Sequence, residues 1–119
     1  MVKICFLSGL EIPKNKYSTE HYAPKSRVPK SIAQQSYNLF PAIKIVNHIK
    51  GNLMPCEWHE QRDYRIAYAY KHYKLKHDDK KILRHLMQHG FPETNPCDYC
   101  ICAKHVQYCV NKELLERSR

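Results

Sequence analysis

The sequence predicts an α+β fold, with two short strands in the first half of the chain and helices in the second. Three observations lead to this prediction: β-favouring apolar runs ended by turn residues, a three-residue apolar spacing after Pro41, and helical patterning beyond Pro55. The 119 residues fit one compact domain, and no internal repeat or low-complexity segment divides them. We therefore expect a single domain over residues 1–119, with a strand-and-helix core in 1–54 and a helical extension in 55–119.

Two strands are predicted near the N-terminus. Residues 2–6 form an apolar, β-favouring run that ends at a Ser-Gly pair, and residues 17–23 form a second run that ends at Pro24. The polar, basic stretch that follows contains another proline, so we expect an extended loop there, with one helical turn near residues 31–34.

A helix is predicted directly after a short extended stretch at residues 38–41. Apolar side chains then recur every three residues at Ile43, Val46 and Ile49, which places them on one helix face. Gly51 is a natural end for this helix, because glycine readily adopts the backbone conformation that closes a helix.

The second half of the chain is predicted to be helical. We expect helices over residues 55–73, from residue 78 or 79 to 89, and over residues 97–116. Pro55 suits a first helical turn, aspartates could cap the second of these helices, and Gly90 would end it.

The charge balance points to a polyanionic partner. The chain has 20 Lys and Arg against 11 Asp and Glu, a formal net charge of +9 and a pI of about 9.3. Nucleic acid is the first candidate for such a chain, and a merely solvated surface is the plain alternative. No apolar stretch is long enough for a membrane span, no helix has a clean basic amphipathic face, and the N-terminus lacks a signal-peptide layout. We therefore expect a cytoplasmic protein with no membrane partner.

Six cysteines suggest a second kind of site. Without a secretory signal they are expected to be reduced thiols or metal ligands rather than disulfides. Pairs at the spacing of zinc ligands allow a structural Zn²⁺ site in one of two places. The first set is Cys56, His59, Cys97 and Cys100, and the second is drawn from residues 97–109, where Cys102, His105 and Cys109 would share a helix face. The favoured interpretation is that these thiols are buried and pack as small apolar residues.

Three short strings carry residues suited to phosphodiester hydrolysis. They are Glu20-His21-Tyr22-Ala23-Pro24-Lys25-Ser26, Asn38-Leu39-Phe40-Pro41 and Asn47-His48-Ile49-Lys50-Gly51-Asn52. A neutral imidazole can take the proton from an attacking water, and a hard cation such as Mg²⁺ binds to oxygen ligands. His21 is the candidate base, and Glu20 and Asn47 offer the oxygens. The carbonyl of Asn38 could accept the second imidazole hydrogen and so fix the tautomer.

Adjacent side chains of a strand point to opposite faces. Glu20 and His21 can therefore serve one site only where the strand ends or bulges. Pro24 favours such an end close to this pair.

Taken together, these strings resemble the HNH nuclease family, whose core is the ββα-metal fold. The matching residues are Glu20-His21 with Pro24, Asn38-Leu39 with Pro41, and Asn47 with Lys50-Gly51-Asn52. The nine-residue step between the two asparagines also agrees with the family, and Cys5-Phe6-Leu7-Ser8-Gly9 resembles the turn that often opens its fold. The resemblance covers about residues 5–54. It implies a metal-dependent endonuclease that hydrolyses DNA, in a bacterial or phage setting.

The resemblance also implies a role for each residue of the site. His21 would be the general base, and Asn38 would orient it. Glu20 and Asn47 would hold one Mg²⁺ or Mn²⁺ ion. The family more often has Asp at the acidic position, and many members have a His at the position of Gly51. We therefore expect a two-ligand oxygen site rather than a His-rich zinc site.

Basic residues are the candidates for contacts with DNA. The resemblance implies that Lys50 lies near the scissile phosphate and that Lys25 and Arg27 contact flanking backbone phosphates. Tyrosines interleaved with basic residues form another candidate surface, although helix packing by the tyrosines is the favoured interpretation. These residues are Tyr64, Arg65, Tyr68, Tyr70, Lys71, Tyr73, Lys74 and Lys76.

Two other functions stay open at this point. One is a non-catalytic, basic DNA-binding module on the same fold, and the other is a toxin or defence effector nuclease that a partner directs to its target. A homodimer would be a natural route to cutting both strands of a duplex.

Overall fold

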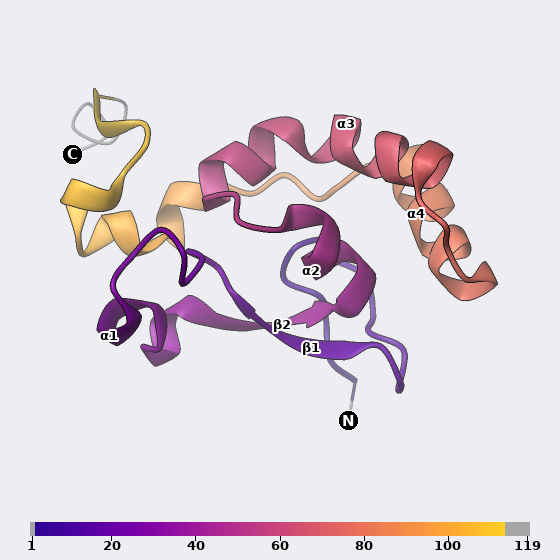
Figure 1. Cartoon of the computed structure of the whole chain (residues 1–119), viewed down its shortest axis with the longest axis horizontal. Helices are drawn as coiled ribbons and strands as arrows, with labels where there is room; N and C mark the ends of the chain where they lie inside the picture. The colour runs from indigo at the N-terminus through magenta and orange to yellow at the C-terminus, as the bar shows by residue number, and fades with distance from the viewer. Residues whose placement is uncertain (1, 114–119) are drawn as a thin grey trace.

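The structure, a computed structural model, describes residues 2–113. It combines a two-stranded antiparallel sheet with several helices, which confirms the predicted α+β class. Helix α2, Lys44–Lys50, lies between the sheet and helix α3, Pro55–His72, and helix α4, His77–His89, lies at one end of the molecule (Figure 1).

The sheet consists of β1, Tyr17–His21, and β2, Leu39–Ile43. The two strands are antiparallel, and the register pairs Glu20 with Phe40. A strand was predicted over residues 17–23, and it is confirmed with an earlier end.

The connection between the strands carries short helical elements. Helix α1 is Lys30–Ala33, which confirms the predicted turn near residues 31–34, and a 3-10 turn, η1, follows at Ser36–Asn38. Pro29 directly precedes α1, and its ring fixes φ at −56° as the helix begins.

Helix α2 follows β2 without a connecting residue. Its first N–H group, that of Lys44, donates to the carbonyl of Lys16 at 2.8 Å, which ties the start of the helix to the residue before β1. Val46 and Ile49 are buried, as the three-residue spacing predicted. The helix ends at Gly51, whose φ of 57° lies in the region that glycine adopts most easily.

The predicted strand over residues 2–6 is wrong. The structure has only an isolated antiparallel bridge between Ile4 and Glu11 in this region. The N–H of Cys5 donates to the carbonyl of Leu10 at 2.7 Å and that of Ile12 to the carbonyl of Lys3 at 2.8 Å, and the pairing then ends because Pro13 begins a turn.

The starts and ends of α3 and α4 follow the predicted signals with one difference. Pro55 occupies the first turn of α3, and the carboxylate of Glu57 accepts a hydrogen bond from the N–H of Met54 at 2.8 Å. Gly90, with φ of 73°, ends α4. The N-cap of α4 is Lys76, so Asp78 and Asp79 lie in the first turn of the helix. Their negative charge there interacts favourably with the positive end of the helix dipole.

The predicted α-helix over residues 97–116 is wrong over residues 97–111, and residues 112–113 are helical. Residues 96–108 instead form three 3-10 turns, η2 at Pro96–Asp98, η3 at Ile101–Ala103 and η4 at Val106–Tyr108. Three consecutive residues, 100–102, are all buried, and one face of an α-helix cannot bury three residues in a row. Residues 114–116 of the predicted helix lie outside the described residues.

Two apolar clusters hold these elements together. The first lies between the sheet, α2, α3 and α4, and its buried members are Cys5, Leu7, Ile12, Tyr22, Ala42, Ile43, Val46, Ile49, Leu53, Trp58, Ile66, Ala69, Leu83 and Leu86. The second joins the loop after β1, the start of α3 and the 3-10 turns. Its buried members are Ala23, Val28, Ala33, Met54, Cys100, Ile101 and Cys102.

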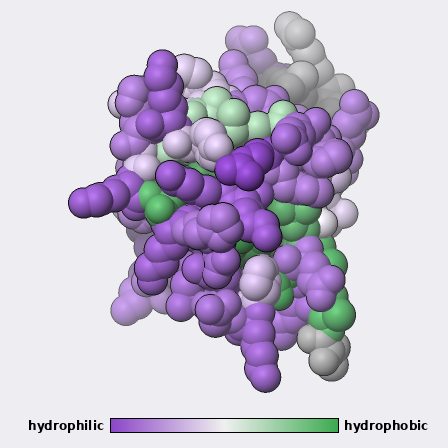
Figure 2. Space-filling view, turned by 90° about the vertical axis from the view of Figure 1, so that its right-hand side faces the viewer, coloured by the Kyte–Doolittle hydropathy of each residue, from purple (hydrophilic) through white to green (hydrophobic). Residues whose placement is uncertain are grey.

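The surface at the α4 end of the molecule is mainly hydrophilic. Figure 2 shows this face with only small apolar patches between polar side chains. Helix α4 exposes Lys80, Lys81 and Arg84, which add positive charge. Over residues 2–113, the structure contains no helix with both the length and the apolar character needed to cross a bilayer.

Candidate active site

The end of strand β1 presents Glu20 and His21 in different environments. Glu20 is only 2% exposed and contacts α2, whereas His21 is half-buried. Nε2 of His21 lies 3.3 Å from Oε1 of Gln34, the residue that ends α1. In the tautomer with hydrogen on Nε2, the ring donates to Gln34, and Nδ1 is the nitrogen that can accept a proton.

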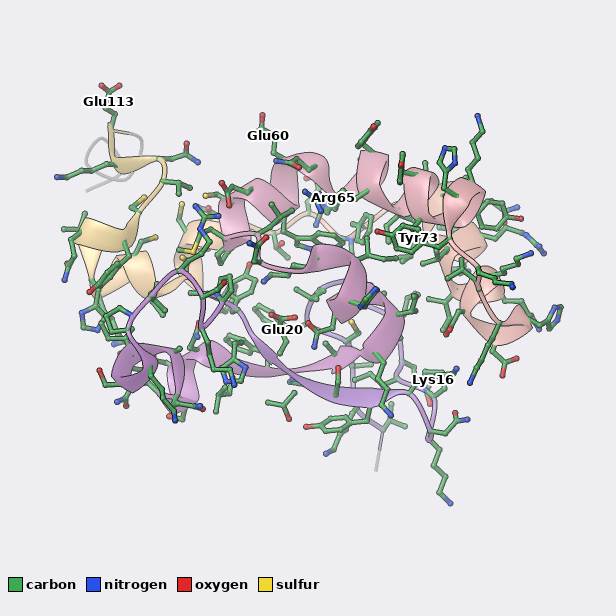
Figure 3. The ribbon with its side chains drawn as sticks, in the orientation of Figure 1. Lys16, Glu20, Glu60, Arg65, Tyr73 and Glu113 are labelled. Atoms are coloured by element: carbon green, nitrogen blue, oxygen red, sulfur yellow. The ribbon has the colours of Figure 1, made fainter. Side chains whose placement is uncertain are left out.

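A buried ion pair joins β1 to α2. Nζ of Lys50 donates to Oε1 of Glu20 at 3.1 Å, and the two side chains are 0% and 3% exposed. Glu20 lies in the space between the strand and α2 (Figure 3). The other carboxylate oxygen of Glu20, Oε2, is buried with no hydrogen-bond partner among the described residues.

Burial works against both charges of this pair. It raises the pKa of Glu20 above its usual range, and the nearby Lys50 ammonium only partly opposes that rise. It also lowers the pKa of Lys50, against the attraction of the Glu20 carboxylate. Each group therefore depends on the other to remain charged inside the protein.

A second polar contact lies along the same seam. Nδ2 of Asn47 donates to Oγ of Ser18 at 3.2 Å, and that hydroxyl donates to the carbonyl of Ala42 at 3.1 Å. Ser18 and Glu20 are two residues apart on one face of β1, and Asn47 and Lys50 are three apart on one face of α2. The structure therefore brings Glu20 and Asn47 to one strand–helix seam, where each contacts a different partner.

Two oxygens of this seam are available as ligands for a cation. Oε2 of Glu20 is unpartnered in the described structure, and Asn47 uses its nitrogen for Ser18, which leaves its carbonyl oxygen as a ligand. Mg²⁺ keeps several waters and is often bound by only one or two protein groups. Among residues 2–113, no three His, Cys, Asp or Glu side chains form a group that could hold a metal ion. Lys50 competes with any cation for the same carboxylate.

Asn38 lies at a different place from the one expected. Its side chain is fully buried, and Oδ1 accepts the N–H of Ala23 at 2.8 Å while Nδ2 donates to the carbonyls of Ala23 and Ala33 at 3.0 Å. The Asn38 side chain thus makes its three hydrogen bonds to backbone groups. The side chain that contacts His21 is that of Gln34. Asn38 fastens the loop that follows β1 to the end of α1.

The three basic side chains expected to contact phosphates differ in their exposure and partners. Lys25 is exposed on the loop after β1. Arg27 forms an ion pair with Glu57 at the start of α3 and donates to the carbonyl of Asn52 at 3.5 Å. Lys50 is fully buried in its pair with Glu20, so it does not reach the surface in this arrangement.

Five of the six cysteines gather at one end of the molecule. Cys100 and Cys102 are buried in the second cluster, with Cys56 and Cys109 packed against it, and sulfur atoms lie between the start of α3 and the 3-10 turns (Figure 3). The Cys102 thiol interacts with those of Cys97, Cys100 and Cys109.

Burial keeps these thiols protonated. It raises the pKa of Cys56 to about 11, and it also raises those of Cys97, Cys100 and Cys102. His59, from the first predicted zinc set, instead lines a hollow with Arg62 and residues 93–95. The structure gathers the thiols without His59, and within residues 2–113 neither predicted zinc set forms a group of three or more ligands that could hold a metal ion. The zinc site therefore stays a prediction.

Two contacts of the site were not anticipated from the sequence. Gln34 belongs to no motif, and only the fold brings it to His21 across 13 positions. Ser18 could have been found, because it lies two residues before Glu20 and a strand repeats its faces every two residues.

The seam thus combines a carboxylate, an amide and an ammonium drawn from one strand and one helix. The half-buried imidazole of His21 follows Glu20 in a strand without a bulge, so it lies on the other face of β1, with Gln34 as its partner. Comparisons of the chain with protein-family models, with curated proteins and with solved structures find no match. Any function assigned to the seam therefore depends on its own residues and their geometry.

Asn38→Ala is expected to destabilise the fold strongly. The change leaves the N–H of Ala23 and two carbonyls without partners in the interior, so we expect a loss of about 3 kcal/mol in the free energy of unfolding, measured by urea denaturation. Asn52→Ala, at an exposed position, is the control and should change stability by less than about 0.5 kcal/mol. Equal effects of the two substitutions would contradict the anchoring role.

The Glu20–Lys50 pair can be tested by a double-mutant cycle. Lys50→Met leaves a buried carboxylate unpaired and should lower the free energy of unfolding by about 4 kcal/mol, whereas adding Glu20→Gln should recover most of that loss. Lys44→Met, at an exposed position of the same helix, should have little effect. Additive effects of the two substitutions in the pair would show that they do not interact.

Cys56 is expected to react slowly with alkylating agents, because burial and the neighbouring thiols raise its pKa. With a pKa of about 11, its thiolate is scarce at pH 8, so we expect alkylation by iodoacetamide to be roughly a hundredfold slower than in guanidinium-unfolded protein. Mass spectrometry of the peptide that contains Cys56 measures the rate. Elemental analysis of the same sample separates burial from zinc binding, and alkylation as fast as in unfolded protein would contradict both.

Proposed function

We propose that the chain is a metal-dependent endonuclease that hydrolyses DNA phosphodiester bonds with one divalent cation. The observation that supports this proposal is the strand–strand–helix order in which Glu20 and His21 end β1 and α2 sets Asn47 and Lys50 against that strand. The same order is what the resemblance to the ββα-metal nucleases implies for these motif residues.

His21 is the proposed general base. It lies at the last position of β1, it is half-buried, and its partner Gln34 is a neutral amide. With hydrogen on Nε2 bonded to Gln34, Nδ1 accepts the proton of the attacking water. Gln34 is then the positioning residue, in the role that the sequence suggested for Asn38.

Glu20 and Asn47 are the proposed ligands of the cation. When bound there, Mg²⁺ or Mn²⁺ supplies positive charge beside the phosphate oxygens. Glu20 offers the oxygen that has no partner in the described structure, and Lys50 neutralises the same carboxylate through Oε1. Lys50 would have to release Glu20 to reach a phosphate, and this exchange would keep one positive charge next to the carboxylate throughout.

The charge of the chain supports a nucleic-acid substrate. The formal net charge of +9 attracts a polyanion, and the exposed Lys25 lies on the loop just beyond His21. The length of DNA that the protein covers, and the strand it cuts, depend on surfaces outside this seam.

A non-catalytic DNA-binding protein is the second candidate, and one observation favours it. Lys50 already neutralises Glu20 inside the protein, so the pair can serve as a purely structural link between β1 and α2. In that case the basic surface would bind DNA and the seam would hold no cation.

His21→Ala separates the two candidates. In Mg²⁺ the variant should cleave supercoiled plasmid at least a hundredfold more slowly than the unaltered chain, because a general base contributes about 10²–10⁴-fold. Its affinity for the same DNA in EDTA should change less than twofold. His85→Ala, on the exposed side of α4, is the matched control and should cleave normally.

The opposite result is equally clear. If the unaltered chain leaves plasmid intact with Mg²⁺, Mn²⁺, Co²⁺, Ni²⁺ and Zn²⁺ yet binds it, the nuclease proposal fails and the DNA-binding function stands.

A further inference from the structure

A shallow groove lies between α2 and α3, and its lining includes neither Glu20 nor Lys50. It encloses about 330 Å³. Its lining residues, which we call the tyrosine groove, are Ile49, Gln61, Tyr64, Arg65, Tyr68 and Tyr73. Figure 3 labels Arg65 and Tyr73 on this side of α3 and just beyond its end.

The groove holds three tyrosines that do not pack into the core. Tyr64, Tyr68 and Tyr73 are 71%, 47% and 40% exposed, so the expectation that these tyrosines serve helix packing is wrong for them. Tyr70 differs, because it packs against the first cluster. A chain that leaves three large aromatic rings together in water keeps an apolar surface that a partner can cover.

The rings form a row with short steps. The centroids of Tyr64 and Tyr68 are 6.1 Å apart, and those of Tyr68 and Tyr73 are 6.4 Å apart. The rings are inclined to one another by 35° and 90°, so their faces do not stack on each other. The ring of His72 lies 4.4 Å from that of Tyr68 at an angle of 40°, so it occupies one side of Tyr68. A flat partner can therefore cover the other side of Tyr68 and the faces of Tyr64 and Tyr73.

Positive charge continues the row beyond Tyr73. A second hollow shares Tyr73 with the tyrosine groove and is also lined by His48, Lys74 and Lys76. A third hollow shares His48 and Lys76 and adds Lys16 and Lys44. Asp79, the acidic residue of these two hollows, is already paired with Lys16 at 3.3 Å. The path from Tyr64 to Lys44 is therefore aromatic at one end and cationic at the other.

We infer that the tyrosine groove binds a single-stranded segment of nucleic acid, with unpaired bases on the tyrosine rings and phosphates on Arg65, Lys74 and Lys76. Stacking on aromatic rings needs free base faces, which a base-paired duplex keeps covered by its neighbours. A cationic path continuous with the rings suits a phosphate backbone better than an apolar protein segment. This inference rests on the proposed function only in taking nucleic acid as the partner.

The test is direct binding of labelled oligonucleotides in EDTA. Fluorescence anisotropy measures the affinity of the full chain for three fluorescein-labelled probes. They are a deoxythymidine 12-mer, a uridine RNA 12-mer and the 12-base-pair duplex of the deoxythymidine strand with its complement. Single strands should bind more tightly than the duplex, and the two single strands distinguish a DNA preference from an RNA preference. A duplex that binds as tightly as both single strands would overturn the inference.

Substitutions locate the binding in the groove. Tyr68→Ala should weaken single-strand binding about tenfold while leaving duplex binding unchanged, and Tyr68→Phe should restore it, because stacking needs the ring alone. Tyr99→Ala, which removes a 49% exposed tyrosine outside the groove, is the matched control and should bind normally. If Tyr68→Ala binds single strands as well as the unaltered chain, the groove is not the site.

The salt dependence tests the cationic end. Replacing Lys74 and Lys76 by Gln should reduce the slope of log affinity against log salt by about 1.4, as expected for two lost phosphate contacts on a single strand. An unchanged slope would contradict those contacts.

The outcomes separate this inference from the nuclease proposal. Tyrosine-dependent binding by a chain that cleaves nothing would sustain the groove and reject the nuclease. Cleavage that depends on His21, by a chain with no preference for single strands, would support the nuclease and reject single-strand binding in the tyrosine groove.

Discussion

The buried contact between Glu20 and Lys50 is the constraint on which the rest of the site depends. Two opposite charges with almost no exposure to solvent can remain ionised only together, so strand β1 and helix α2 must stay in one relative position. The Asn47–Ser18 hydrogen bond lies on the same seam and also holds α2 against β1, through neutral groups. The polar residues that the motifs supply therefore also determine how the helix sits on the sheet.

The loop after β1 gives the imidazole its surroundings. Asn38 binds the backbone of Ala23 and Ala33, which holds α1 close to the end of β1. Gln34 at the end of α1 then meets His21. Asn38 therefore acts on His21 indirectly: it fixes the loop, and the loop positions Gln34, which contacts the imidazole.

Local signals predicted much of the fold. Gly51, Pro55 and Gly90 mark helix boundaries because their backbone preferences act within one turn. The extension beyond residue 96 was mispredicted because residues 100–102 are all buried by tertiary packing, which overrides helical spacing. The site was predictable in its residue types and less so in its contacts, since the burial of Lys50 needs the three-dimensional structure.

In the proposed function, Glu20 and Asn47 together hold one divalent cation. Electron paramagnetic resonance of Mn²⁺ titrated into the full chain measures this directly, because bound Mn²⁺ loses the sharp six-line signal of the free ion. The account predicts one site per chain, weakened at least tenfold by Glu20→Gln and retained in Lys44→Met. A titration in which all added Mn²⁺ stays free, or in which Glu20→Gln binds it equally well, would contradict the account.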